Sequence, residues 1–131
     1  MKKLILLLLF SPLVSFGQTA QEYYDKGKSY FDLKQYYNAI SDFDKSIELD
    51  PEFRDVYFYR VFCKDELEDY YGAISDYNKA IELDPDYTSP YVNRGIAKEL
   101  INDLTGACLD WKKAASLGST NAAKWVANQC N

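Results

Sequence analysis

The chain has 131 residues, a length that allows one domain, and its 15 basic and 20 acidic residues give a formal net charge of −5. This acidic balance argues against nucleic acids and anionic membrane surfaces as partners, because both bind proteins through basic patches. The absence of histidine excludes histidine-based catalytic triads and zinc sites with histidine ligands, and no motif in the chain indicates an enzyme or a cofactor.

The first segment, residues 1–17, is predicted to be a secretory signal peptide. Two lysines precede an apolar run that starts at Leu4, and residues 15–17 (Ser-Phe-Gly) form the small-x-small pattern of a cleavage site. The run contains Pro12 and is short for a bilayer span of roughly 20 residues, although an uncleaved anchor is the alternative. We therefore expect the mature chain, 18–131, to be periplasmic or secreted in a Gram-negative bacterium, without a stable membrane span.

A repeated phrase organises the rest of the chain. AISDFDKSIELDP at residues 39–51 recurs as AISDYNKAIELDP at residues 73–85, with ten of thirteen positions identical and a spacing of 34 residues. Extending the phrase in both directions gives units at 20–53, 54–87 and, more weakly, 88–118, here called repeats 1, 2 and 3. A fixed period of this length is typical of stacked helical repeats.

Each unit is predicted to contain two helices. Apolar residues recur at three- and four-residue spacing with charges between them, and prolines near the unit ends stop the second helix. Thr19 followed by Glu22 forms a capping box for the first helix, and Ser89-Pro90 favours another helix start. The predicted helices are 20–33, 36–49, 54–67, 70–83, 89–101 and 105–117.

The units resemble tetratricopeptide repeats, because small and large residues alternate at that family's positions. The small residues are Gly27, Ala39, Ser46, Ala73, Ala80, Gly95, Ala107 and Ala114, and the large ones are Tyr23, Tyr30, Phe43, Tyr57, Tyr77, Tyr91 and Trp111. The resemblance implies an all-α fold, a right-handed α-α superhelix of three helix-turn-helix units plus a C-terminal capping helix. Small residues admit a close helix approach that the rings then fill. An unrelated helical bundle is the alternative.

Some positions depart from the family pattern. Val61 stands where glycine is usual, and Lys64 and Lys98 stand where tyrosine is usual. Lys26, Arg60 and Arg94 occupy positions where leucine is common; their stems are expected to cover apolar surface while their charges reach water.

The end of the chain, 120–130, is predicted to be a capping helix that covers the last repeat. The sequence from residue 107 onward also resembles Sel1-type repeats. Cys108 lies ten residues before Gly118 and Cys130 twelve after it, so an antiparallel helix pair places the two cysteines level. We predict a Cys108–Cys130 disulfide and a buried free thiol at Cys63, with three unpaired thiols as the alternative.

The resemblance also implies a peptide groove, lined by the first helix of each repeat. The candidate groove residues are Tyr24, Lys28, Phe31, Phe58, Phe62, Asp65, Glu66, Val92, Ile96 and Glu99. Some family members hold a peptide's C-terminal carboxylate with cationic and amide side chains. The matching positions here are Tyr24, Lys28, Tyr59, Ser89 and Asn93, of which only Lys28 is cationic, so this clamp is not expected.

The predicted function is that of an exported, non-enzymatic protein–protein interaction module without a cofactor. Its partner is expected to be a protein or peptide segment with apolar anchors and a basic flank. The rival hypothesis is a self-assembling structural component of an envelope complex. Three repeats are expected to expose a first-helix face and the convex-side residues Tyr37 and Tyr71, which a second copy of the chain could bury. A small-molecule binder or accessory enzyme is a third, weaker alternative.

Overall fold

The structure, a computed structural model, describes residues 17–131, and the predicted signal peptide lies outside these residues except for Gly17. The described part forms seven α-helices and no strand: α1 (Ala20–Asp32), α2 (Tyr36–Leu49), α3 (Arg54–Glu66), α4 (Tyr70–Leu83), α5 (Thr88–Leu100), α6 (Leu104–Ser116) and α7 (Thr120–Gln129). All seven helices predicted from the sequence are confirmed, each within one residue of its expected bounds.

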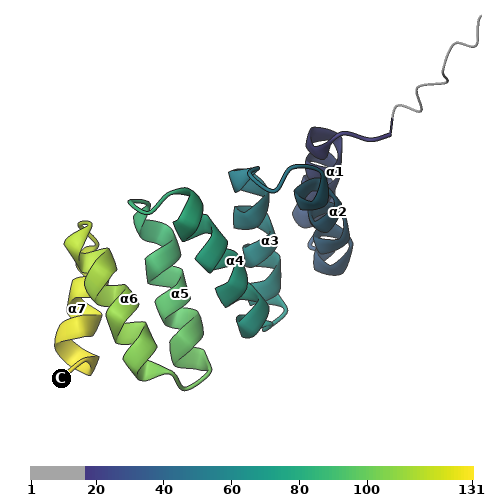
Figure 1. The fold of residues 1–131 in the computed structure, drawn as a ribbon. Helices are drawn as coiled ribbons and strands as arrows, with labels where there is room; N and C mark the ends of the chain where they lie inside the picture. Colours follow the sequence, from purple (N-terminus) through teal and green to yellow (C-terminus); the bar gives the residue numbers. More distant parts are fainter. Residues whose placement is uncertain (1–16) are drawn as a thin grey trace, which may run out of the picture.

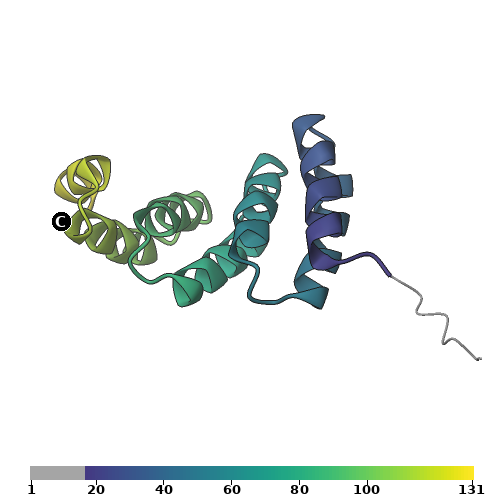
Figure 2. The ribbon, with the colours of Figure 1, turned by 90° about the horizontal axis from the view of Figure 1, so that it is seen from above.

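The helices stack in chain order as antiparallel pairs. Within the repeats α1 packs on α2, α3 on α4 and α5 on α6, while α2–α3, α4–α5 and α6–α7 contacts join successive units. Figure 1 shows this array with the capping helix α7 at the end opposite α1. Seen from above in Figure 2, the direction of the helices changes progressively along the chain, as expected of an α-α superhelix.

Within the described residues 17–131, no helix is long and apolar enough to cross a membrane. The same residues contain no group of three or more His, Cys, Asp or Glu side chains that could hold a metal ion.

Small side chains allow the paired helices to approach closely, as the sequence predicts. Ala39, Ala73 and Ala107 are each 0% exposed. A methyl group added to Gly27 would lie 2.5 Å from the Phe43 ring, and one added to Gly95 would lie 2.3 Å from the Trp111 indole nitrogen. These contacts are too short for any Cβ, so the glycines are required by the rings of the partner helix.

The turn inside each repeat uses the same backbone conformation three times. Lys34, Glu68 and Asn102, spaced 34 residues apart, have φ angles of 58°, 59° and 65°. Each follows the C-cap of the first helix, where a left-handed residue lets backbone N–H groups bond the last carbonyls of the helix. The sequence repeat therefore extends to the backbone of the turn.

Two aspartates start second helices by capping them. The Asp69 carboxylate accepts the backbone N–H of Gly72 at 3.0 Å, and the Asp103 carboxylate accepts that of Gly106 at 2.9 Å. A Cβ at either glycine would lie 2.2 Å from Oδ2 of the capping carboxylate, which explains why glycine follows three residues after each aspartate. In repeat 1, Gln35 stands at the cap position and makes no such bond.

Buried ion pairs join the two helices of repeats 2 and 3. The Arg60 guanidinium donates two hydrogen bonds to Asp76, one of them from Nε at 2.9 Å, and Lys64 Nζ lies 3.1 Å from the same carboxylate. Repeat 3 has the equivalent contacts of Arg94 and Lys98 with Asp110. The three equivalent cations, Lys26, Arg60 and Arg94, have side chains that are 51%, 16% and 17% exposed.

The expectation that these cations reach water is therefore wrong for Arg60 and Arg94. Their guanidinium groups turn inward because a buried carboxylate on the second helix meets each of them. Only Lys26 behaves as expected, since its Nζ lies 3.8 Å from Asp42 and its side chain stays half exposed.

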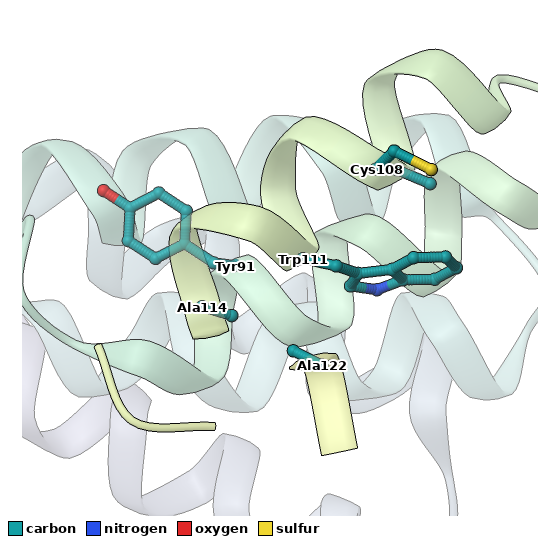
Figure 3. Packing of buried hydrophobic residues seen from close by; sticks show 6 residues of the cluster. Tyr91, Cys108, Trp111, Ala114 and Ala122 are labelled. Carbon is teal, nitrogen blue, oxygen red and sulfur yellow. The ribbon is translucent and has the colours of Figure 1, made fainter. Parts of the chain in front are cut away.

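The capping helix α7 is held to α6 by a Cys108–Cys130 disulfide, the pairing predicted from the sequence, with the two Cα atoms 5.6 Å apart. Beside it, the Trp111 and Trp125 rings pack with centroids 5.2 Å apart. Figure 3 shows Trp111 and Ala114 on α6 and Ala122 on α7 gathered in this cluster, with Cys108 close by. Cys63 is a buried free thiol, as predicted, and burial raises the pKa of its thiol to about 12.

Candidate peptide-binding face

The candidate site is the face formed by the first helices of the repeats, α1, α3 and α5, here called the inner face. Each first helix packs against the second helix of its own repeat, and α1 also packs directly against α3. The second helices α2 and α4 make no comparable contact with each other. The α1–α3 contact places the first helices of repeats 1 and 2 side by side, and the curvature of stacked repeats creates a concave binding surface.

Phe58 and Phe62 form the centre of this face. They lie one turn apart on α3, so their side chains point the same way, and each is 45% exposed. Each ring packs against another aromatic ring. Phe31 packs edge-on against Phe62 with centroids 5.2 Å apart, and Tyr59 packs edge-on against Phe58 with centroids 5.9 Å apart. Two neighbouring rings that are half exposed and held in place make an apolar contact surface.

Tyr24 belongs mainly to the core. It is 9% exposed, and its ring packs against Phe53, Tyr59 and Phe43 at centroid distances of 4.9, 5.7 and 6.2 Å. Burial, with contributions from Tyr59 and Asp55, raises the pKa of its phenol to about 12. The sequence placed Tyr24 on the groove surface, but this cluster of aromatic rings covers most of it.

Lys28 lies over two of these rings. Its Nζ is 5.5 Å from the centroid of Tyr24 and 5.3 Å from that of Tyr59, within the range of cation–π attraction. The single cation among the family's clamp positions is therefore already engaged inside the chain. Because its charge already has these partners, contact of Lys28 with a bound peptide stays a prediction.

The first of two clefts, here called the Arg54 cleft, lies at the start of α3. It has a volume of about 430 Å³ and is lined by Tyr24, Arg54, Asp55, Phe58, Tyr59, Ala80, Asp84 and Tyr87. The antiparallel pairing of α3 with α4 brings the start of one helix level with the end of the other. The sequence analysis missed Asp84 and Tyr87 because it considered first helices alone. The predicted turn between residues 67 and 70 pairs α3 with α4, and this pairing could have indicated that the end of α4 lies beside the start of α3.

The second, here called the Asn93 cleft, lies at the other end of α3. It has a volume of about 230 Å³ and is lined by Asp65, Glu66, Tyr70, Asn93, Ile96, Ala97 and Leu100. Glu66 and Leu100 are exposed, whereas Asp65 accepts a hydrogen bond from the Tyr77 hydroxyl. Burial raises the pKa of the Asp65 carboxyl above its usual range, although the Tyr77 hydrogen bond opposes this shift.

The predicted groove residues on α5 differ in how much surface they offer. Val92 and Ile96 are partly buried and pack against the cluster around Trp111, so they contribute only part of their side chains to the inner face. Glu99 is exposed beside Leu100. Of the ten predicted groove residues, the structure brings Tyr24 and Phe58 to the Arg54 cleft and Asp65, Glu66 and Ile96 to the Asn93 cleft.

Comparison with protein families gives two matches in this chain. A tetratricopeptide repeat profile matches residues 20–53, and a second TPR repeat profile matches residues 66–101. The chain belongs to the tetratricopeptide repeat family. No curated protein matches the sequence as a relative.

Solved structures of similar chains share the fold. The first TPR of Spaghetti (RPAP3), bound to the HSP90 peptide SRMEEVD, is 27% identical with a TM-score of 0.73, covering 85% of this chain and 90% of that one. MamA is 26% identical with a TM-score of 0.73, covering 80% of this chain and 61% of that one. The TPR2B domain of yeast Sti1 in its pHsp70 complex is 26% identical with a TM-score of 0.68, covering 83% and 88%.

Proposed function

We propose that this protein is an exported, non-enzymatic interaction module that binds a peptide or protein segment on its inner face. The observation that carries the proposal is the pair Phe58 and Phe62, each 45% exposed at the centre of that face and braced by Phe31 and Tyr59. Burying these two rings against apolar side chains of a partner would release a large apolar area from water.

The chemistry of the face favours a ligand with apolar anchors and basic flanking residues. Exposed acidic side chains, Glu66 and Glu99, lie towards the C-terminal ends of α3 and α5. The RPAP3 structure contains an acidic peptide, SRMEEVD. Such a ligand does not suit this chain, because the one cation at the clamp positions, Lys28, already lies over Tyr24 and Tyr59.

Export rests on the N-terminal sequence, with support from the disulfide. Disulfides such as Cys108–Cys130 persist in oxidising compartments, the periplasm included. Mass spectrometry of the protein purified from its native host tests this step. A mature chain that begins at Gln18 is the expected result, and an intact Met1 would contradict cleavage.

The binding step is tested by selecting random twelve-residue peptides, displayed on phage, against chain 18–131. We expect enriched peptides to contain large apolar residues with lysine or arginine beside them. The variant Phe58→Ala/Phe62→Ala should keep the melting temperature within a few degrees, because both side chains are half exposed, and should bind the enriched peptides at least about tenfold more weakly.

A matched control removes two aromatic rings elsewhere. Tyr37 and Tyr71, on α2 and α4, are 77% and 74% exposed and lie on the second helices. Tyr37→Ala/Tyr71→Ala should leave peptide affinity unchanged. Equal affinities of the Phe58→Ala/Phe62→Ala variant and the unmodified chain would overturn the proposed binding face.

The exposure of Tyr37 and Tyr71 also favours a second candidate function, a self-assembling structural component. A second copy of the chain could bury these two rings, since they occupy equivalent positions in successive repeats. Light scattering over a range of concentrations separates the two functions. A monomer at every concentration would rule out self-assembly, whereas an oligomer that dissociates in the Tyr37→Ala/Tyr71→Ala variant would support it.

A further inference from the structure

The Arg54 cleft combines aromatic rings with carboxylates. Four of its lining residues are aromatic: Tyr24, Phe58, Tyr59 and Tyr87. Its charged lining residues are Asp55, Asp84 and Arg54, so the carboxylates outnumber the cation by two to one. A cleft of about 430 Å³ is large enough to take one long side chain of a partner.

The one cation of the cleft is held loosely at its edge. Arg54 Nη1 lies 3.3 Å from Asp84 and Nε lies 3.8 Å from Asp55, and the Arg54 side chain is 57% exposed. Exposed ion pairs of this kind contribute little to stability, so a ligand can displace or share them at small cost. Both carboxylates are therefore accessible to a second cation.

The rings of the cleft already attract a positive charge within the chain. The Lys28 ammonium lies over Tyr24 and Tyr59, although Lys28 is not itself part of the lining. Cations gain both from ring faces and from nearby carboxylates.

We propose that the Arg54 cleft receives a lysine or arginine side chain of the peptide bound on the inner face. The aliphatic stem of that side chain would pack on Phe58 and Tyr59 while its charged end reaches Asp55 and Asp84. This inference rests on the proposed function and deepens it, because it assigns a basic residue to a position next to the Phe58–Phe62 pair. The opposite end of the same face, at Glu66 and Glu99, is a separate acidic region.

The cleft can be tested without knowing the natural partner. Acetyl-arginine amide, acetyl-norleucine amide and acetyl-glutamate amide are titrated into ¹⁵N-labelled chain 18–131, and backbone amide shifts are followed by NMR. We expect the arginine compound to shift the amides of Asp55, Phe58, Asp84 and Tyr87, with a smaller effect of the norleucine compound and none of the glutamate compound.

A pair of charge variants locates the effect. Asp55→Asn/Asp84→Asn should weaken binding of the arginine compound at least about threefold, since it removes both carboxylates. Glu66→Gln/Glu99→Gln removes the same charge from the other end of the face and should leave this affinity unchanged. All four carboxylates are at least partly exposed, so both variants are expected to fold.

Three results would overturn the proposal: equal shifts by the arginine and norleucine compounds, binding of the glutamate compound through Arg54, or no shift at the cleft. Failure here is distinguishable from failure of the proposed function. If phage peptides bind through Phe58 and Phe62 while the arginine compound does not reach the cleft, only the cation subsite is wrong. If the arginine compound binds the cleft but Phe58→Ala/Phe62→Ala retains full peptide affinity, the binding face is wrong.

Discussion

Repeat 1 differs from repeats 2 and 3 in the ion pairs that join its two helices. In repeats 2 and 3 an arginine and a lysine on the first helix share one buried aspartate on the second helix. In repeat 1 the equivalent pair is Lys26 and Asp42, 3.8 Å apart, and Tyr30 stands where the second lysine would be. The three repeats therefore share the fold, while their ion pairs vary from unit to unit.

The difference also concerns the joints between repeats. Arg60 reaches back to Asp44 of repeat 1 at 2.8 Å, and Arg94 reaches back to Asn78 of repeat 2 at 2.8 Å. A forked guanidinium can bond two acceptors at once, which an ammonium does with less fixed geometry. The arginines therefore join three helices each, whereas Lys26 joins two.

The largest expected effect comes from removing a shared aspartate. Asp76→Ala leaves Lys64 without its partner and Arg60 with Asp44 alone, both cations being mostly buried, and should lower the free energy of unfolding by about 3–5 kcal/mol. Asp42→Ala leaves Lys26, which is half exposed and can be hydrated, so it should cost about 1 kcal/mol. Urea unfolding followed by circular dichroism measures both. Equal losses would show that the repeats do not differ as described.

The disulfide gives the next largest effect. Cys130→Ser removes the covalent link between α6 and α7 and should lower the free energy of unfolding by about 3 kcal/mol on the chain-entropy model. Cys63, which has no disulfide partner, provides a control cysteine in the same chain. Adding a reducing agent should destabilise the unmodified chain and Cys63→Ala by similar amounts, and should leave Cys130→Ser unchanged. A reductant effect on Cys130→Ser would contradict this account.

The buried thiol predicts a pH dependence. Burial raises the pKa of Cys63 from 9.0 to about 12, so the native state prefers the protonated thiol. The contribution of this group is fully present below pH 9 and is lost as the pH rises from 9 towards 12, by about 1.4 kcal/mol per pH unit within that range.

The measurement is urea unfolding at pH 8 and pH 10. The unmodified chain should lose more stability between the two than Cys63→Ala does, because tyrosines that titrate in the same range are common to both. An identical loss in the two proteins would show that the Cys63 thiol is not shielded from water.

The smallest expected change in the free energy of unfolding comes from the N-caps of the second helices, in which repeat 1 again differs from repeats 2 and 3. Gln35 does not cap α2, whereas Asp69 and Asp103 cap α4 and α6 with glycine three residues later. Gln35→Asp/Asn38→Gly transfers that pair to repeat 1 and should raise the free energy of unfolding by about 0.5 kcal/mol, the cap offsetting the added glycine. Gln35→Asp alone should gain less, because the Cβ of Asn38 would crowd the capping carboxylate, as a Cβ at Gly72 or Gly106 would. Equal gains would contradict this explanation of Gly72 and Gly106.

Most of the fold could be predicted because it depends on periodic patterns within single helices. The 34-residue period, the buried Ala39, Ala73 and Ala107, and the level positions of Cys108 and Cys130 all follow from counting residues along the chain. The ion pairs could not be found in this way. Arg60 and Asp76 lie 16 residues apart on different helices, and each separately has the character of a surface residue.

The candidate site was predicted less completely, for a related reason. Phe58 and Phe62 were assigned to the inner face, but the burial of Tyr24 depends on three rings from α2, the α2–α3 loop and α3. The contribution of Asp84 and Tyr87 to the Arg54 cleft depends on the pairing of α3 with α4. Surface residues at such junctions need the tertiary arrangement, which a single-helix pattern does not contain.

The most direct test of the proposed function is a crystal structure of chain 18–131 with the peptide most enriched in the phage selection. The account predicts that apolar side chains of the peptide contact Phe58 and Phe62 on the inner face formed by α1, α3 and α5. A peptide seated instead against Tyr37 and Tyr71, with the two phenylalanines still facing water, would contradict it.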